Sequence, residues 1–173
     1  MTISHAALLA LGYVAGTPLD VAVVFVQLIV ELALEMMVDR LQTRIAFGKP
    51  LAEQSVWHER IGESRCMIDQ ARLLTLKTAW LMDHTSPKEA RIWISMIKTV
   101  VPNMTLKVVD EAIQMFGGIG VSQDTPLAEM WSGQRTLRLA DGPDAVHRMV
   151  VGRNELKPYL ADTPAVGTTF RDG

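Results

Sequence analysis

The sequence has a single cysteine, few aromatic residues and no excess of charge of one sign. Cys66 is alone among 173 residues, which excludes an intramolecular disulfide and a zinc site built from several thiolates. The 17 Lys and Arg residues nearly balance 19 Asp and Glu residues, so the basic face of a nucleic-acid-binding protein is not expected. An aromatic content of 6% beside 10 methionines favours a helical core over a β-sandwich.

Long hydrophobic runs and early positive charges are also lacking. The apolar stretches 6–14 and 21–30 both fall short of the about 20 residues that span a bilayer. No Lys or Arg precedes Arg40, so the basic region of a signal peptide is absent. We expect no secretion signal and no stable membrane insertion, with contact of residues 21–38 with a membrane surface as a minor alternative. The expected compartment is the cytoplasm of a bacterium, or the mitochondrion or peroxisome of a eukaryote.

Capping signals divide the chain into helices. Thr17-Pro18-Leu19-Asp20 and Ser86-Pro87-Lys88-Glu89 each combine an N-cap hydroxyl, a proline at the first helical position and a carboxylate at the third. Gly117 and Gly118 permit the left-handed conformation that ends a helix. Together with apolar residues at helical intervals, these signals predict helices at 19–44, 51–83, 87–116, 126–137 and 143–160. The predicted fold is all-α, an up-and-down four-helix bundle with three long helices and a shorter one.

The same periodicity predicts which side chains face the core. In the first helix they are Val24, Leu28, Leu32, Met36 and Leu41. In the second they are Val56, Ile61, Met67 or Ile68, Leu74 and Leu81, and in the third Ile92, Met96, Val100, Met104, Val108 and Ile113. Cys66 lies on a stretch of the second helix that we expect to be packed, which predicts a buried, inert thiol.

Few residues form a pattern that points to chemistry. Only Asp144 and His147 have the spacing of a carboxylate-bridged metal site, and this pair is single, so no metal site is expected. Residues 117–120, Gly-Gly-Ile-Gly, follow no strand and are not a dinucleotide fingerprint, but they allow close approach of the backbone to a flat or phosphorylated ligand. Asp141 precedes Gly142 and Pro143 and either points into a cleft or complements the dipole of the next helix.

Taken together, these segments resemble the C-terminal helical domain of the acyl-CoA dehydrogenase family. The likeness covers residues 28–160, with residues 1–27 as a divergent apolar segment and 161–173 as a flexible tail. The last segment is similar to the branch called family members ten and eleven, in which Asp occupies the position of the catalytic carboxylate. The matching segments are Arg44-Ile45-Ala46-Phe47-Gly48-Lys49-Pro50-Leu51, Ala71-Arg72, Lys98, Gln114-Met115-Phe116-Gly117-Gly118-Ile119-Gly120 and Leu137-Arg138-Leu139-Ala140-Asp141-Gly142-Pro143-Asp144-Ala145-Val146-His147.

The resemblance implies specific roles. Asp141 matches the base that removes the α-proton of an acyl-CoA thioester while a hydride passes to the flavin, and Gly142 beside it is expected to bind substrate. Arg44 and Phe47 match residues that reach the FAD of a neighbouring subunit. The cofactor is then FAD, the substrate an acyl-CoA, and the assembly a homo-oligomer, either a dimer or a tetramer. Gln114, Gly117 and Gly118 match the segment near the adenine and pyrophosphate of the same FAD.

The sequence also departs from the family pattern. The family's N-terminal helical domain and middle β-domain are not found in these 173 residues. Ser132 and Gly133 replace the usual Arg-Asp pair before the base, and Pro143 and Ala145 stand where many members place Thr and Gln. We therefore expect the C-terminal domain of an FAD-dependent acyl-CoA dehydrogenase that is incomplete as an isolated chain. The alternative is a non-catalytic helical oligomerisation or interaction module derived from that domain.

Overall fold

The helix boundaries lie close to the predicted ones, except that the helix expected from residue 51 begins at Ser55, after a 3₁₀ turn. The computed structural model describes residues 18–160, with side chains from residue 26 onward. Its helices are α2 (Pro18–Thr43), α3 (Ser55–His84), α4 (Pro87–Phe116), α5 (Leu127–Thr136) and α6 (Asp144–Leu160). The short elements are strands β1 (Ile45–Ala46) and β2 (Lys49–Pro50) and the 3₁₀ turns η1 (Leu51–Glu53) and η2 (Gly117–Val121). The predicted all-α class is confirmed.

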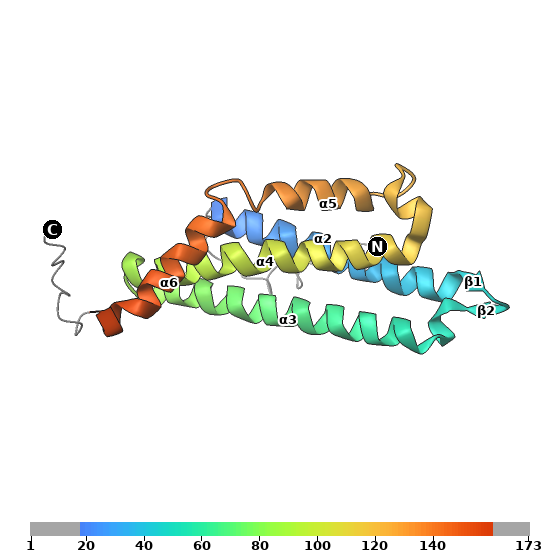
Figure 1. Cartoon of the computed structure of the whole chain (residues 1–173), viewed down its shortest axis with the longest axis horizontal. Helices are drawn as coiled ribbons and strands as arrows, with labels where there is room; N and C mark the ends of the chain where they lie inside the picture. Colours follow the sequence, from blue (N-terminus) through green and yellow to red (C-terminus); the bar gives the residue numbers. More distant parts are fainter. Residues whose placement is uncertain (1–17, 161–173) are drawn as a thin grey trace, which may run out of the picture.

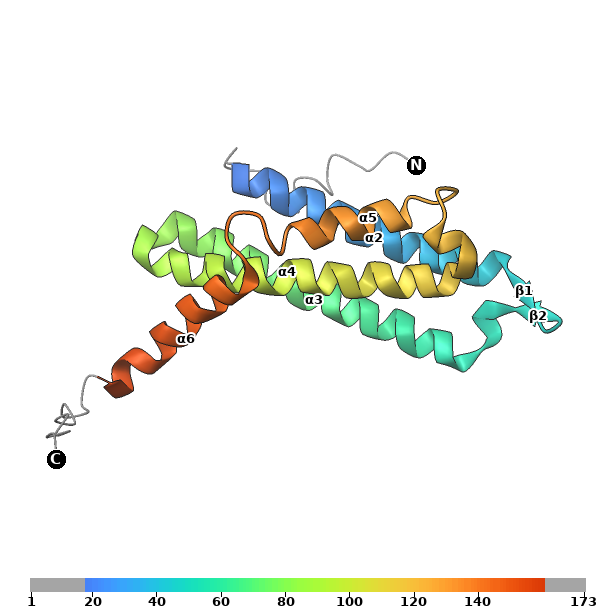
Figure 2. The same ribbon diagram turned by 45° about the horizontal axis from the view of Figure 1, so that its top comes forward.

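Four of the helices alternate in direction along the long axis of the molecule. Figure 1 shows α2 and α4 running one way and α3 and α5 running the other, and in Figure 2 α6 points away from these four. The predicted N-cap at Thr17, the apolar run 6–14 and the tail 161–173 lie outside the described residues. The domain boundary at residue 28 stays a prediction, and α2 is continuous across it.

The start and end of α4 follow the predicted signals. The Ser86 hydroxyl accepts a hydrogen bond from the backbone N–H of Glu89, and the Glu89 carboxylate accepts one from the N–H of Ser86, so two otherwise unpaired donors are satisfied. At the other end, Gly117 has a φ of +65°, a conformation that side-chain-bearing residues rarely adopt. These two signals fix the length of the central helix.

Helix α4 forms the centre of the core, because α2, α3, α5 and α6 all pack against it. Residues 87–121 are long and apolar enough to cross a membrane by length and composition. In the structure this apolar character is used for packing against the four neighbouring helices. The core cluster consists of Val30, Ala33, Leu34, Met37, Leu41, Leu51, Ile68, Ala71, Met104, Val108, Val109, Ala112, Met115 and Leu127.

The predicted inward face of α2 is right at Leu41, which is buried, and at Met36, which packs against the core, but wrong at Leu32. Val26, Val30, Leu34 and Met37 are buried, whereas the predicted Leu32 is 44% exposed. Residues 26–38 are apolar around most of the helix, so periodicity alone did not select one stripe. The contacts of α2 with α3 determine which face of α2 points inward, because Glu31 of α2 faces α3.

An ionic cluster joins α2 to α3. Arg65 donates to both carboxylate oxygens of Glu31, at 3.1 and 3.0 Å. Arg72 also pairs with Glu31 and donates to Asp69 at 2.9 Å. Gln27 of α2 donates to the same Glu31 carboxylate at 3.1 Å. One carboxylate on α2 therefore holds two arginines of α3, which fixes the register of the two helices.

Three further predictions about exposure are wrong. Val56 and Val100 were expected in the core but are 46% and 41% exposed. Cys66 is exposed rather than buried. It lies two residues from the buried Ile68, which is about 200° around an α-helix and places the thiol on the other face of α3.

Two substitutions on α3 test this assignment of faces. We expect Ile68→Ala, at a fully buried position, to lower the free energy of unfolding by about 2–5 kcal/mol, because it leaves a cavity in the core. Val56→Ala, at the exposed position, should change it by about 0.5 kcal/mol or less. Chemical denaturation followed by circular dichroism measures both. Equal losses in the two variants would contradict the assignment.

Candidate functional site

The first group of candidate residues lies at the hairpin between α2 and α3. The hairpin pairs Ala46 with Lys49, which leaves Phe47 and Gly48 as the turn. Both have positive φ, +56° and +81°, as the two central residues of a type I′ turn require. A bulky residue is uncommon in this conformation. The turn holds Phe47 almost entirely in solvent, with 96% of its surface exposed.

Arg44 stands immediately before this hairpin. Its backbone carbonyl accepts a hydrogen bond from Leu51 at 2.9 Å, which closes the base of the hairpin. Its side chain is exposed. The hairpin therefore presents a cation and an aromatic ring to solvent, with the main chain held by hydrogen bonds beneath them.

The second group lies at the end of α4. Gln114, Gly117 and Gly118 are exposed, and a Cβ atom added to either glycine would meet nothing within 4 Å. Gly120 differs, because its added Cβ would lie 2.7 Å from the carbonyl oxygen of Ile113, so that glycine serves the fold. The open backbone at 117–118 permits close approach of a ligand.

The hairpin and the end of α4 lie at the same end of the molecule, as both views show (Figures 1 and 2). The guanidinium of Arg40 in α2 lies 5.2 Å from the ring centroid of Phe116 in α4, a cation–π contact that ties the two elements together. Arg44, Phe47, Gln114, Gly117 and Gly118 are thus exposed residues at one end of the molecule, and their shared role stays a prediction. We call these five residues the hairpin-end group.

Asp141 and Gly142 lie elsewhere, in the loop between α5 and α6. Figures 1 and 2 both place this loop at the end of α5 that is remote from the hairpin. Asp141 is exposed and has a φ of +53°, and Gly142 has a φ of +102°. The structure therefore does not bring Asp141 together with the hairpin-end group in one chain. A site that needs both must be completed by another molecule.

The loop that carries Asp141 is held by α4 and α6. Lys98 of α4 donates to the carbonyl oxygens of Leu137 and Ala140, the latter at 2.6 Å. His147 of α6 lies with Nε2 3.2 Å from the carbonyl oxygen of Asp141, so Nε2 carries the proton of this bond. A Cβ on Gly142 would lie 3.1 Å from the same nitrogen, so the position favours glycine for both its φ and its neighbour.

Asp144 is the centre of this arrangement. It is buried at the start of α6, where its Oδ2 accepts hydrogen bonds from Arg138 at 2.7 Å and from Asn103 of α4 at 3.1 Å. Burial raises the pKa of Asp144. The hydrogen bonds from Asn103 and Arg138 and the charges of Arg138 and Arg148 lower the pKa by more than burial raises it. The pKa therefore lies below its usual value of 3.8.

These contacts are what the sequence analysis missed. Asp144 and His147 were considered as a metal pair, but they bind Arg138, Asn103 and the Asp141 carbonyl instead. Within residues 18–160, no group of three or more His, Cys, Asp or Glu residues could hold a metal ion. The opposite charges of Arg138 and Asp144, six residues apart on either side of Asp141, could have predicted their ion pair. The sequence gives no comparable indication of the hydrogen bond from Asn103.

Known proteins match this chain over most of its length. The family model described as acyl-CoA dehydrogenase, C-terminal domain, matches residues 21–156. The chain belongs to the acyl-CoA dehydrogenase family. It is 51% identical over 126 residues to the acyl-CoA dehydrogenase FadE2 of Mycobacterium tuberculosis, covering 73% of this chain and 31% of that protein. It is 52% identical over 127 residues to mouse acyl-CoA dehydrogenase family member 10, covering 73% of this chain and 12% of that protein.

Solved structures of the family share the helical arrangement. An acyl-CoA dehydrogenase from Mycobacterium abscessus is 48% identical with a TM-score of 0.75, covering 78% of this chain and 33% of that one. Butyryl-CoA dehydrogenase of Megasphaera elsdenii is 28% identical with a TM-score of 0.72, covering 79% of this chain and 35% of that one. The chain therefore spans about a third or less of the relatives that it matches.

These findings confirm the predicted family, and the cofactor of that family is FAD. Acyl-CoA dehydrogenases are an oxidoreductase family of FAD-binding flavoproteins, and FAD complexes occur among the structural neighbours of this domain. The hairpin-end group of this acyl-CoA dehydrogenase domain fits such a cofactor in its chemistry. It offers a cation for phosphate, an aromatic ring and an amide for a base, and open glycine backbone.

Substitution of Asp144 tests the structure of the Asp141 loop. We expect Asp144→Asn to lower the free energy of unfolding at pH 7 by about 1–3 kcal/mol, because Arg138 loses its charged partner. The folded-state pKa is below the unfolded value, so the carboxylate stabilises the fold fully above about pH 4. This stabilisation is lost as the pH falls through the folded-state pKa, and the variant should then approach the wild type.

Denaturation curves between pH 7 and pH 3 measure this difference. Asp110→Asn, an exposed carboxylate on α4, is the matched control and should behave as the wild type does. A deficit of Asp144→Asn that stays constant down to pH 3 would show that the charge of Asp144 is not the source of the stabilisation.

Proposed function

We propose that this chain acts as the C-terminal domain of an FAD-dependent acyl-CoA dehydrogenase, which introduces a double bond between Cα and Cβ of an acyl-CoA thioester. The observation that carries the proposal is the exposed carboxylate of Asp141 on a loop held by Lys98, Asp144 and His147. The chain spans about a third or less of its relatives, so the activity belongs to an assembly that includes the remaining domains.

In this proposal Asp141 is the base that takes the α-proton. No residue in the described part of the chain pairs with its carboxylate, which leaves the oxygens available to substrate. Asp is one methylene shorter than Glu, and the left-handed backbone at Asp141 and Gly142 sets the direction of the shorter side chain. Because Asp141 is exposed here, exclusion of water falls to the other domains of the enzyme.

The hairpin-end group holds the FAD in this proposal. Arg44 would pair with phosphate oxygens, Phe47 would stack on a ring, and Gln114 would hydrogen-bond beside the open backbone of Gly117 and Gly118. The flavin, when bound, supplies the acceptor for the hydride that leaves Cβ. The hairpin-end group lies away from Asp141. We therefore propose that it binds the FAD that is used by Asp141 of a neighbouring subunit, in a homodimer or homotetramer.

A chimera tests the role of Asp141. Residues 21–156 of this chain replace the matching segment of Mycobacterium tuberculosis FadE2, which is 51% identical to it. We expect Asp141→Asn in the chimera to slow the bleaching of the flavin by acyl-CoA by about 10²–10⁴-fold, because the proton acceptor is lost. Stopped-flow absorbance under anaerobic conditions measures the rate, and flavin content shows that the cofactor is retained.

Asp110→Asn in the same chimera is the control, since its carboxylate is exposed on α4. It should keep the rate of the unsubstituted chimera. An Asp141→Asn chimera that keeps both its flavin and its rate would remove Asp141 from the chemistry.

A second variant tests the flavin contact. We expect Phe47→Gly in the chimera to raise the Kd for FAD by about two- to tenfold, the loss of one aromatic contact. The fold should be unaffected, because Phe47 is 96% exposed and glycine favours its positive φ. Fluorescence titration with FAD measures the Kd. Leu156→Ala, exposed on α6, is the control, and an unchanged Kd in Phe47→Gly would exclude the contact.

One observation supports the alternative of a non-catalytic interaction module. Leu73, Leu76 and Trp80 are exposed on α3 at helical spacing, which gives the helix an apolar stripe that another protein surface can cover. Both the dehydrogenase domain and the interaction module are expected to self-associate, so a measurement of oligomeric state does not distinguish them. The FAD titration separates them, because a domain that serves only for assembly has no reason to bind flavin at the hairpin-end group.

A further inference from the structure

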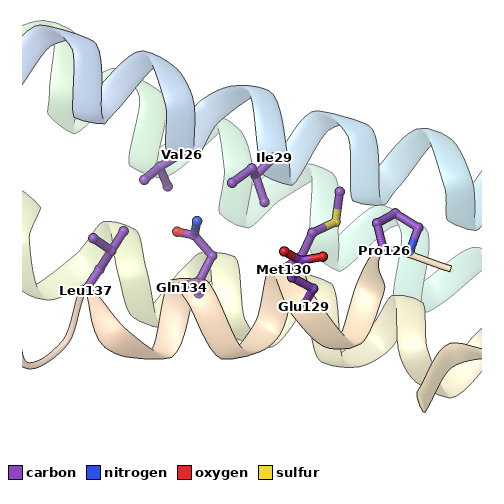
Figure 3. A pocket seen from close by; sticks show the side chains of 8 residues that line it. Val26, Ile29, Pro126, Glu129, Met130, Gln134 and Leu137 are labelled. Atoms are coloured by element: carbon purple, nitrogen blue, oxygen red, sulfur yellow. The ribbon is translucent and has the colours of Figure 1, made fainter. Parts of the chain in front are cut away.

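A groove between α2 and α5 is not used by the function proposed above. Its volume is about 470 Å³, within the range of small-molecule sites. Figure 3 shows Val26 and Ile29 of α2 facing Met130, Gln134 and Leu137 across it. Pro126, Glu129 and Gly133 complete the lining, which is mostly apolar.

Gln134 is the unusual residue of this groove. It is only 3% exposed, and Figure 3 shows its side chain pointing from α5 towards α2, between Val26 and Ile29. Its Oε1 is buried and has no hydrogen-bond partner. A buried acceptor without a donor is destabilising, and most such groups in proteins are paired. A ligand in the groove that carries a hydrogen-bond donor can therefore pair with Oε1 of Gln134.

The charge of the groove limits the ligand further. Glu129 lines it and is exposed to solvent, and no basic residue is among the lining residues. A carboxylate cannot donate to Oε1 and is repelled by Glu129. An ammonium group can also donate, but its desolvation among the apolar walls costs more than that of a neutral hydroxyl group, which donates and meets no repulsion. The apolar walls take an alkyl chain attached to it.

We propose that the groove between α2 and α5 binds a single-chain alcohol, with the alkyl chain along Val26, Ile29, Met130 and Leu137 and the hydroxyl donating to Gln134. The inference does not depend on flavin, on Asp141 or on the hairpin-end group. It assigns to the domain a second site, separate from the loop that carries Asp141.

Three probes of the same length separate the contributions of the chain and the head group. They are 1-octanol, octyl methyl ether, which lacks the donor, and octanoate, which lacks the donor and carries a charge. We expect 1-octanol to bind about two- to tenfold more tightly than the ether, the gain from one hydrogen bond, and octanoate to bind most weakly. NMR titration of the full chain labelled at the methionine methyl groups reports on Met130 directly.

Variants connect the preference to Gln134. In Gln134→Leu the unpaired acceptor is gone, so we expect a thermal midpoint at least as high as that of the wild type and less than about a twofold preference for 1-octanol over the ether. Met130→Trp fills the groove and should abolish binding of all three probes. Met149→Trp, exposed on α6 and outside the groove, is its control and should bind as the wild type does.

Two results would overturn the proposal. One is the absence of any shift at Met130 with 1-octanol up to its solubility limit, which would leave the groove as a surface for another part of the enzyme. The other is equal binding of alcohol, ether and octanoate, or a preference for alcohol that persists in Gln134→Leu. Neither result bears on flavin binding or dehydrogenation, which are measured separately.

Discussion

The carboxylate of Asp144 is the contact on which the presentation of Asp141 depends. It joins Arg138 before the loop, Asn103 on the central helix and the first turn of α6. Its pKa is lowered because two hydrogen bonds and two guanidinium charges outweigh the cost of burial. Removal of Asp144 takes from Arg138 its charged partner, and removal of Arg138 takes from the largely buried carboxylate its nearest cation. The loop between them is therefore held in one conformation.

This constraint explains the unusual backbone of the loop. Asp141 and Gly142 both have positive φ, and the backbone can keep that conformation because Lys98 and His147 bind the carbonyls around it. The hairpin at the other end uses the same principle. Hydrogen bonds at its base hold Phe47 at positive φ in solvent. In both places the residue with the unfavourable positive φ, Asp141 or Phe47, is one to which we assign a functional role.

The distance between these two places determines how the domain can work. One chain presents Asp141, the proposed base, in the loop after α5 and the hairpin-end group, the proposed flavin contact, at the other end, with the length of α5 between them. The two cannot act on one substrate within a single copy. The proposed dehydrogenase therefore needs at least two copies of the domain, in addition to the domains that its relatives have beyond the matched segment.

Local signals predicted the helices well, and long-range contacts account for what was missed. The capping box of Ser86 and the glycine at 117 act within one turn, so the bounds of α4 could be read from sequence. The face of Leu32 was wrong because an apolar helix such as α2 has no preferred stripe until its neighbours are known. The contact of Asp144 with Asn103 and the unpaired oxygen of Gln134 depend on α4 and α2 respectively, and no spacing within a single helix encodes them.

Subunit mixing tests the central claim, that one copy supplies the base and another the flavin contacts. Chimeric subunits with Asp141→Asn are assembled with subunits carrying both Arg44→Ala and Phe47→Gly. Acyl-CoA-dependent flavin bleaching is measured at an FAD concentration too low to fill the sites of the second variant. If the site is shared between copies, each mixed dimer contains one intact site, and activity rises well above that of either variant alone. If both groups act within one copy, every site stays defective, and the mixture shows only the average of the two variants.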